Sequence, residues 1–198
     1  HLSDRRNHRR AHGTLSAGVW HYRERKDNCK RSNILNTFIR EMTIEDINQV
    51  RQIYILGWQN AFRGIVPQPY LDTMNLDDWA PPLNGAYVLT DGTNILGTSS
   101  VAPAGDSAFE GWGEIISVFV LPHLIGQGYG DQLFAFVKEK LFEQQYTNIY
   151  LTVFEDNHRA RKFYEKHDFL WNGERLTINV GGKDLIELRY VFSKEAKG

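Results

Sequence analysis

Three glycines in the run Gly126-Gln127-Gly128-Tyr129-Gly130 lie between a β-rich segment and a segment with helical spacing of apolar residues. Glycine permits positive φ and lets a ligand approach the backbone closely. The free amides at the start of the following helix, together with the helix dipole, favour an anion such as phosphate. No Gly-Lys-Ser/Thr follows the loop, and the glycine spacing does not match a dinucleotide fingerprint, so we exclude both kinds of nucleotide site.

The loop belongs to the longer run Phe119-Val120-Leu121-Pro122-His123-Leu124-Ile125-Gly126-Gln127-Gly128-Tyr129-Gly130. Further along stands Asn157-His158-Arg159-Ala160-Arg161-Lys162-Phe163-Tyr164-Glu165-Lys166-His167-Asp168-Phe169. These two runs, in this order, resemble the acyl-CoA loop and the second signature of the GNAT superfamily of acyltransferases. The resemblance covers about residues 38–193.

The resemblance implies a mixed, mostly antiparallel sheet that is splayed at its centre, with the pantetheine arm of acetyl-CoA inserted between two strands. Backbone groups of Val118, Phe119 and Val120 would then bind the acyl-pantetheine, and Asn157 would hydrogen-bond the pantetheine arm. Backbone amides would hold the pyrophosphate, and they belong to Gly126, Gln127, Gly128, Tyr129, Gly130 and Asp131.

Two positions depart from the family pattern. Ile125 stands where the family usually has Arg or Gln, so one side-chain contact with phosphate is missing and we expect weaker CoA binding. Asp168 stands where the family usually has Gly before the final Phe169, and Asp tolerates the turn conformation that this position needs.

Acyl transfer to an amine needs a group that accepts the amine proton and an acid for the departing thiolate. By the resemblance Tyr164 lies beside the thioester sulfur, and we assign it as the acid; the alternative is a core tyrosine bonded to backbone. Glu114, at the head of the predicted central strand, is the candidate base, acting through water. The alternative for Glu114 is a solvated carboxylate at a strand end.

Trp58 and Phe62 stand one helical turn apart in a segment that resembles the acceptor-side helix and loop of a bacterial branch of the family. They are candidates for binding the acceptor amine by cation–π contact, although core packing is the commoner fate of such a pair. His123 and His167 have no partners at metal-ligand spacing, so we predict no metal site.

Hydrophobic periodicity predicts the elements that position these groups. Strands are expected at 38–40, 86–90, 94–102, 114–120, 148–154, 169–180 and 184–192. Helices are expected behind a Thr43–Asp46 capping box, over 70–74, after the glycine loop and from Asn157, and Pro67 and Pro69 are expected to end regular structure. The fold class is therefore α/β (α+β), with antiparallel hairpins at both ends and a strand–helix–strand unit in the middle.

The composition is that of a globular chain: of 198 residues, 41% are apolar and 24% are charged, which excludes a disordered or fibrous protein. The one cysteine, Cys29, excludes a disulfide framework and a cysteine-ligated zinc site and fits a reducing compartment. No segment approaches the roughly 18 apolar residues of a membrane span. We therefore expect a cytoplasmic protein without a membrane partner.

The charges are divided unevenly along the chain. Residues 1–40 hold 10 Lys and Arg against 3 Asp and Glu, whereas residues 41–198 hold 13 against 21. We assign residues 1–37 to a basic N-terminal arm or leader outside catalysis and residues 38–198 to the GNAT-like domain. The arm lacks the apolar core of a secretory signal, and no aromatic or glycine pattern supports nucleic-acid recognition, so we favour a solvated leader.

These features together predict an N-acetyltransferase that moves an acetyl group from acetyl-CoA to a primary amine by direct attack in a ternary complex. The acceptor is a small-molecule amine or a protein amino group, and the acidic body favours a cationic one. The alternative is a catalytically weak CoA-binding sensor or inactive homologue whose basic arm binds nucleic acid. The identity of the acceptor and the formation of a homodimer are left open by the sequence.

Overall fold

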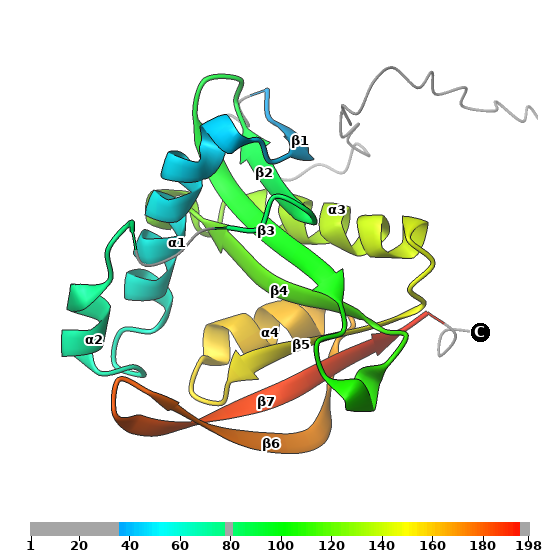
Figure 1. The fold of residues 1–198 in the computed structure, drawn as a ribbon. Coiled ribbons are helices and arrows are strands. Elements are labelled where there is room, and N and C mark those ends of the chain that lie inside the picture. The colour runs from blue at the N-terminus through cyan, green and yellow to red at the C-terminus, as the bar shows by residue number, and fades with distance from the viewer. Residues whose placement is uncertain (1–35, 78–80, 195–198) are drawn as a thin grey trace, which may run out of the picture.

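The computed structural model describes residues 36–77 and 81–194 (Figure 1). The basic arm assigned to residues 1–37 lies outside this part of the chain, except for Asn36 and Thr37.

Strands and helices follow one another in the order that the periodicity predicts, with small shifts at their ends. The strands are β1 (Phe38–Glu41), β2 (Ala86–Thr90), β3 (Ile95–Pro103), β4 (Gly113–Val120), β5 (Asn148–Phe154), β6 (Leu170–Val180) and β7 (Lys183–Ser193). The α-helices are α1 (Ile47–Ala61), α2 (Gln68–Thr73), α3 (Tyr129–Glu143) and α4 (His158–Lys166). Short 3₁₀ turns cover Ile44–Asp46, Ser107–Phe109 and Pro122–Leu124.

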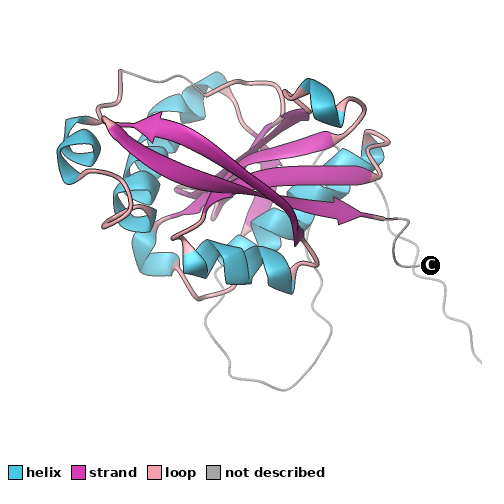
Figure 2. Cartoon of the chain, turned by 90° about the horizontal axis from the view of Figure 1, so that it is seen from below, coloured by secondary structure: helices cyan, strands magenta, loops and turns pink. Residues whose placement is uncertain are grey.

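The seven strands form one sheet in the order β1-β2-β3-β4-β5-β7-β6. All neighbouring pairs are antiparallel except β4 and β5, which are parallel because the helix α3 connects them. Figure 2 shows helices on both sides of the strands. This is the mixed, mostly antiparallel sheet flanked by helices that the resemblance implies.

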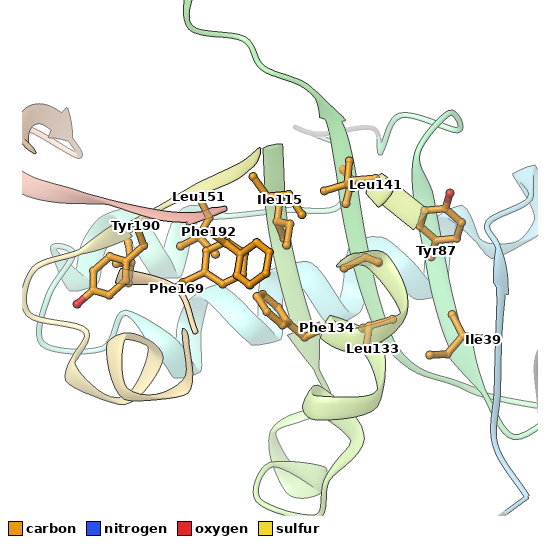
Figure 3. Packing of buried hydrophobic residues seen from close by; sticks show 14 of the residues in the cluster. Ile39, Tyr87, Ile115, Leu133, Phe134, Leu141, Leu151, Phe169, Tyr190 and Phe192 are labelled. Atoms are coloured by element: carbon orange, nitrogen blue, oxygen red, sulfur yellow. The ribbon is translucent and has the colours of Figure 1, made fainter. Parts of the chain in front are cut away.

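The helices α1 and α3 pack on opposite faces of the sheet, as successive residues of β4 show. Val118 and Val120 pack in the main core with Leu133 and Phe134 of α3. Figure 3 shows Leu133 and Phe134 in this core from close by. Phe119, between them in the chain, packs in a second cluster with residues of α1. Each face of the open sheet is therefore covered by a different helix.

The predicted capping box lies on the 3₁₀ turn Ile44–Asp46, which leads directly into α1. The Asp46 carboxylate accepts a hydrogen bond from the Thr43 amide (2.8 Å) and forms an ion pair with Arg40 of β1 (2.6 Å). The hydrogen bond from Arg40, with those from Thr43, outweighs burial and lowers the pKa of Asp46 to about 2. This pair ties α1 to the edge of the sheet.

Asp168 and the prolines at the start of α2 lie where the chain changes direction or begins a helix. Asp168 has a φ of 69°, which confirms the turn conformation predicted for it. The prediction that Pro67 and Pro69 end regular structure is wrong, because α2 begins there, with Pro67 at its N-cap and Pro69 in its first turn. Proline fits this place because the first amides of a helix have no partner within the helix.

Candidate active site

The sheet opens between β4 and β5. These strands pair only at their first residues, Gly113 with Ile149 and Glu114 with Tyr150, and Figure 1 shows them diverging beyond this point. The remaining residues of β4, up to Val120, have no strand partner on this side within the described part of the chain. The opening corresponds to the splay that the resemblance implies.

Alternate residues of β4 turn their backbone groups towards this opening. The Leu121 amide donates a hydrogen bond to the Leu96 carbonyl of β3 (2.9 Å), so the backbone of Phe119, two residues earlier, faces β3 as well. Backbone groups alternate in direction along a strand, so those of Val118 and Val120 face the opening. Of the three residues predicted to bind pantetheine through the backbone, Val118 and Val120 are therefore oriented for it and Phe119 is turned to β3.

The predicted phosphate loop leads from the end of β4 into α3. Gly128 is the N-cap of α3 and has a φ of 90°, in the left-handed region that favours glycine. The Gln127 amide donates to the Leu124 carbonyl (3.3 Å), and its side chain donates to the His123 carbonyl (2.9 Å). The other predicted amides donate no hydrogen bond to a described residue; they belong to Gly126, Gly128, Tyr129, Gly130 and Asp131. A helix N-terminus with free amides binds an anion.

Two residues at the start of α3 have side chains with structural roles, so only their backbone amides remain for a ligand. The Tyr129 ring is buried in the main core. The Asp131 carboxylate pairs with Lys166 (2.7 Å) and His167 (2.9 Å), which joins the start of α3 to the end of α4. Burial raises the pKa of Asp131, but the hydrogen bonds from these two partners outweigh it and lower the pKa overall.

Asn157 is 8% exposed and is the N-cap of α4, where its Oδ1 accepts a hydrogen bond from the Ala160 amide (3.2 Å). The Nδ2 group of Asn157 donates no hydrogen bond to a described residue. The cap therefore holds the side chain in one orientation and leaves its two donor hydrogens for a ligand.

Tyr164 projects from α4 into the same core as α3. Its ring lies near the rings of Phe134 (5.7 Å between centroids), Phe163 (5.6 Å) and Tyr190 (6.4 Å). Burial raises the pKa of Tyr164 to about 12, so the hydroxyl stays protonated at neutral pH. Within the described part of the chain the hydroxyl has no hydrogen-bond partner. The ring is packed as in a core tyrosine, but the backbone hydrogen bond of that alternative is absent there.

Glu114 lies on the other face of the sheet, because the next residue, Ile115, faces the main core. Its Oε2 accepts hydrogen bonds from the Tyr150 hydroxyl (2.7 Å) and the Gly105 amide (3.2 Å). Burial, together with the hydrogen bond to the carboxylate, raises the pKa of Tyr150 to about 12 and keeps this hydroxyl a donor. These hydrogen bonds hold Glu114 in one place. The two candidate catalytic residues, Glu114 and Tyr164, therefore lie on opposite faces of the sheet.

Trp58 and Phe62 belong to a row of five aromatic rings that we call the aromatic wall. Its centroid distances are 5.2 Å from Phe119 to Tyr54, 5.9 Å from Tyr54 to Trp58, 4.8 Å from Trp58 to Phe62 and 4.9 Å from Phe62 to Phe154. The wall therefore runs from the end of β4 to the end of β5. Trp58 and Tyr54 also line a cavity of about 260 Å³ between α1 and α2.

A buried arginine that the sequence analysis missed supports the face on which Glu114 lies. Arg189 of β7 is 4% exposed; its Nη2 donates to Asp106 (2.8 Å) and its Nε lies 2.8 Å from a carboxylate oxygen of Glu174. The guanidinium also lies over the Tyr150 ring, 5.0 Å from its centroid. These partners come from separate parts of the chain, so no local spacing could have indicated the cluster.

Among residues 36–77 and 81–194, no group of three or more His, Cys, Asp or Glu side chains is placed to hold a metal ion. Within the same ranges, no helix combines the length and the apolar character needed to cross a membrane.

The glycine at the N-cap gives a direct test of the phosphate loop. An alanine at position 128 meets no atom within 4 Å, but it must adopt a φ of 90°, so the loop amides will shift. We expect Gly128→Ala to weaken CoA binding about tenfold or more, the loss of one or two hydrogen bonds to a charged group. Calorimetric titration with CoA measures this.

Gly173→Ala is the matched control, because Gly173 of β6 has a φ of 96° and equally open surroundings. It should lower the melting temperature to a similar extent and leave CoA affinity unchanged. Equal CoA affinity in wild type and a folded Gly128→Ala protein would remove the loop from the site.

Comparison with known proteins identifies the family. The family model described as Acetyltransferase (GNAT) family matches residues 47–169. The "Uncharacterized N-acetyltransferase YuaI" of Bacillus subtilis (strain 168) is 29% identical over 172 residues, which cover 79% of this chain and 98% of that protein.

Solved structures share the fold. PaiA N-acetyltransferase from Thermoplasma acidophilum in complex with coenzyme A has a TM-score of 0.59 and 14% identity, and the match covers 79% of this chain and 98% of that one. Ribosomal-protein-alanine N-acetyltransferase from Brucella melitensis has a TM-score of 0.59 and 21% identity, with 78% and 98% covered. The family match, the curated relative and the shared fold agree with the open sheet and its glycine loop: the chain belongs to the GNAT family of acetyltransferases and is an acyltransferase.

Proposed function

We propose that this acyltransferase moves the acetyl group of acetyl-CoA to a primary amine by direct attack in a ternary complex. The observation that carries the proposal is the continuity of the site: the open edge of β4 leads directly into the free amides at the start of α3. Those amides suit a pyrophosphate at the end of a pantetheine arm that lies along β4. The complex of PaiA with coenzyme A and that of yncA from Salmonella typhimurium with acetyl-CoA support this co-substrate.

The residues present fit the pantetheine arm and the pyrophosphate of acetyl-CoA. The backbone groups of Val118 and Val120 would pair with the pantetheine amides as a neighbouring strand would. The free Nδ2 of Asn157 would donate to the same arm. Ile125 offers no hydrogen bond, so the phosphates would be held by backbone amides alone at this point of the loop.

In the proposed reaction, a neutral amine attacks the carbonyl carbon of the thioester, so that a C–N bond forms and the C–S bond breaks. Glu114 takes the proton that the amine loses, through a water molecule. Tyr164 donates a hydrogen bond to the sulfur as negative charge gathers there, and supplies the proton of the thiol. Burial raises the pKa of Tyr164, and it would also raise the pKa of a thiol formed beside it, which keeps this transfer feasible.

The acceptor would approach from the face that carries Glu114. Tyr164 faces the core under α3 and α4, whereas Glu114 and the aromatic wall lie on the other side of the sheet. Separate faces let the amine and the leaving thiol meet their own proton acceptor and donor without competition. Aromatic faces and a fixed carboxylate both favour a positively charged amine.

Release of CoA tests the proposal. The chain, incubated with acetyl-CoA and a panel of primary amines and amino-terminal peptides, should produce free thiol, and mass spectrometry should find the acetylated amine in equal amount. Acetyl-CoA without an amine is the control for simple hydrolysis. Tight CoA binding without transfer to any member of the panel would instead support the CoA-binding sensor or inactive homologue.

We also propose that residues 1–37 are dispensable for acetyl transfer, because every residue assigned to the reaction lies after Phe38. A shortened chain that begins at Phe38 should keep its kcat and KM for acetyl-CoA within about a factor of two, by the additivity expected for independent parts. Steady-state kinetics beside a melting curve measure this. Loss of turnover in a folded shortened chain would place the arm in the acceptor site or in a dimer contact.

A further inference from the structure

Glu187 of β7 is a carboxylate that the proposed reaction does not use. It pairs across the sheet with Phe154 of β5 and Leu176 of β6. Paired residues of neighbouring strands lie on the same face, so Glu187 shares its face with Phe154, the last ring of the aromatic wall. Since Glu114 pairs with Tyr150 of β5, Glu114 lies on this face too.

Other carboxylates near this face have partners. Asp106 and Glu174 both lie against Arg189, and Glu114 accepts hydrogen bonds from Tyr150 and Gly105. The Glu187 carboxylate has neither a hydrogen bond nor an ion pair within the described part of the chain.

The surroundings of Glu187 make an unpaired charge costly. The side chain is half-buried, and both of its cross-strand neighbours are apolar. Burial raises the pKa of Glu187, repulsion from Glu114 adds to this, and attraction to Arg189 opposes it. The charge of Arg189 is already balanced by Asp106 and Glu174. A buried carboxylate in this state is stabilised by a cation that binds beside it.

We propose that Glu187 binds a second positive charge of the acceptor, so that the chain selects alkyl diamines and polyamines over monoamines. The proposal rests on the proposed function and adds the substrate class to it. One amino group of the acceptor, in its neutral form, would attack the thioester and pass the proton that it loses through water to Glu114, while the other stays a charged ammonium group beside Glu187. Phe154 beside Glu187 is buried against Phe62, so the carboxylate is the group that would bind the ammonium.

Binding can be measured without turnover. Cadaverine and pentylamine have the same carbon chain and differ in one terminal ammonium group. Calorimetric titration of the CoA-saturated chain should give about tenfold or greater preference for cadaverine, the size expected for a partly desolvated charge pair. Glu187→Gln should abolish the preference by weakening cadaverine binding, and Glu187→Asp should retain part of it.

Glu139→Gln is the control, because Glu139 is exposed on α3, over the other face of the sheet, and its loss changes the net charge equally. It should keep the preference. If long-range attraction alone caused the preference, removal of either carboxylate would weaken it equally. Equal affinity of the wild-type chain for the two amines would overturn the proposal, as would a preference that survives in a folded Glu187→Gln protein.

The kinetic counterpart separates this proposal from the proposed function. Glu187→Gln should lower kcat/KM for cadaverine about tenfold and leave that for pentylamine unchanged. Equal losses for both amines would overturn the role of Glu187 in selection while leaving acetyl transfer intact. Absence of CoA release with every amine would instead overturn the proposed function, and the binding preference would still decide the role of Glu187.

Discussion

Replacement of Tyr164 by phenylalanine should lower the turnover number for acetyl transfer by roughly ten- to a thousandfold. The substitution removes one hydroxyl and keeps the ring, so its packing against Phe134 and Phe163 should survive. CoA affinity should change by less than about twofold, because the hydrogen bond to sulfur strengthens only as charge develops in the transition state. Steady-state kinetics with an accepted amine, a CoA titration and a melting curve measure the three quantities.

Tyr190→Phe is the matched control for Tyr164→Phe. Tyr190 lies in the same core, but its hydroxyl donates to Glu165 (2.9 Å) and accepts from Arg161 (3.1 Å). Its loss should lower the melting temperature and leave turnover unchanged. If Tyr164→Phe behaves in the same way, with a lower melting temperature and normal turnover, Tyr164 is a core tyrosine and the acid must be sought elsewhere.

The pH dependence gives a second test of the same assignment. Burial raises the pKa of Tyr164 to about 12, so the hydroxyl remains a donor well above neutral pH. A loss of activity at moderately alkaline pH should therefore not come from ionisation of Tyr164. Any alkaline limb below about pH 10, the usual tyrosine range, should persist unchanged in the residual activity of Tyr164→Phe.

The local parts of this site can be predicted from sequence because short-range sterics determine them. The glycine loop, the N-cap role of Asn157 and the left-handed turn at Asp168 each depend on a residue type and its immediate neighbours. The strands are predictable for a similar reason, since alternation and β-branched residues mark them without knowledge of their partners.

Which backbone groups of β4 face the opening could not be predicted in the same way. The direction depends on the register between β3 and β4, which shifts between Ser100 and Val101, opposite Ile116. A shift of one residue reverses which groups are free. For this reason Phe119, predicted together with Val118 and Val120, has its backbone turned to β3.

The charged groups of the acceptor face are also beyond a local analysis. Glu187 and Arg189 reach this face because β7 lies between β5 and β6 in the sheet, against their order in the chain. Alternation along β7 shows only that the two side chains lie on the same face of the sheet. It leaves open which strands lie beside β7 and therefore which side chains are their neighbours. The strand order, which is a property of the whole fold, decides that they lie beside Phe154 and Tyr150.

Substitution of Glu114 by glutamine should slow acetyl transfer by roughly a hundredfold and should flatten the acid limb of the pH–rate profile. The glutamine carbonyl can still accept the hydrogen bonds that the carboxylate receives from Tyr150 and Gly105, so the local structure should be preserved. What is lost is the ability to take a proton from the attacking amine. Kinetics over a pH range with one accepted amine, beside CoA affinity and a melting curve, measure the effect.

Tyr150→Phe separates the base from its surroundings. This variant removes the 2.7 Å hydrogen bond to Glu114 but keeps the carboxylate, so the acid limb should remain, with a change in rate of less than about tenfold for one lost neutral donor. A full rate and an unchanged profile in Glu114→Gln would show that water alone deprotonates the amine. Glu114 would then be a structural acceptor that ties Tyr150 and Gly105 to β4 where the two strands begin to separate.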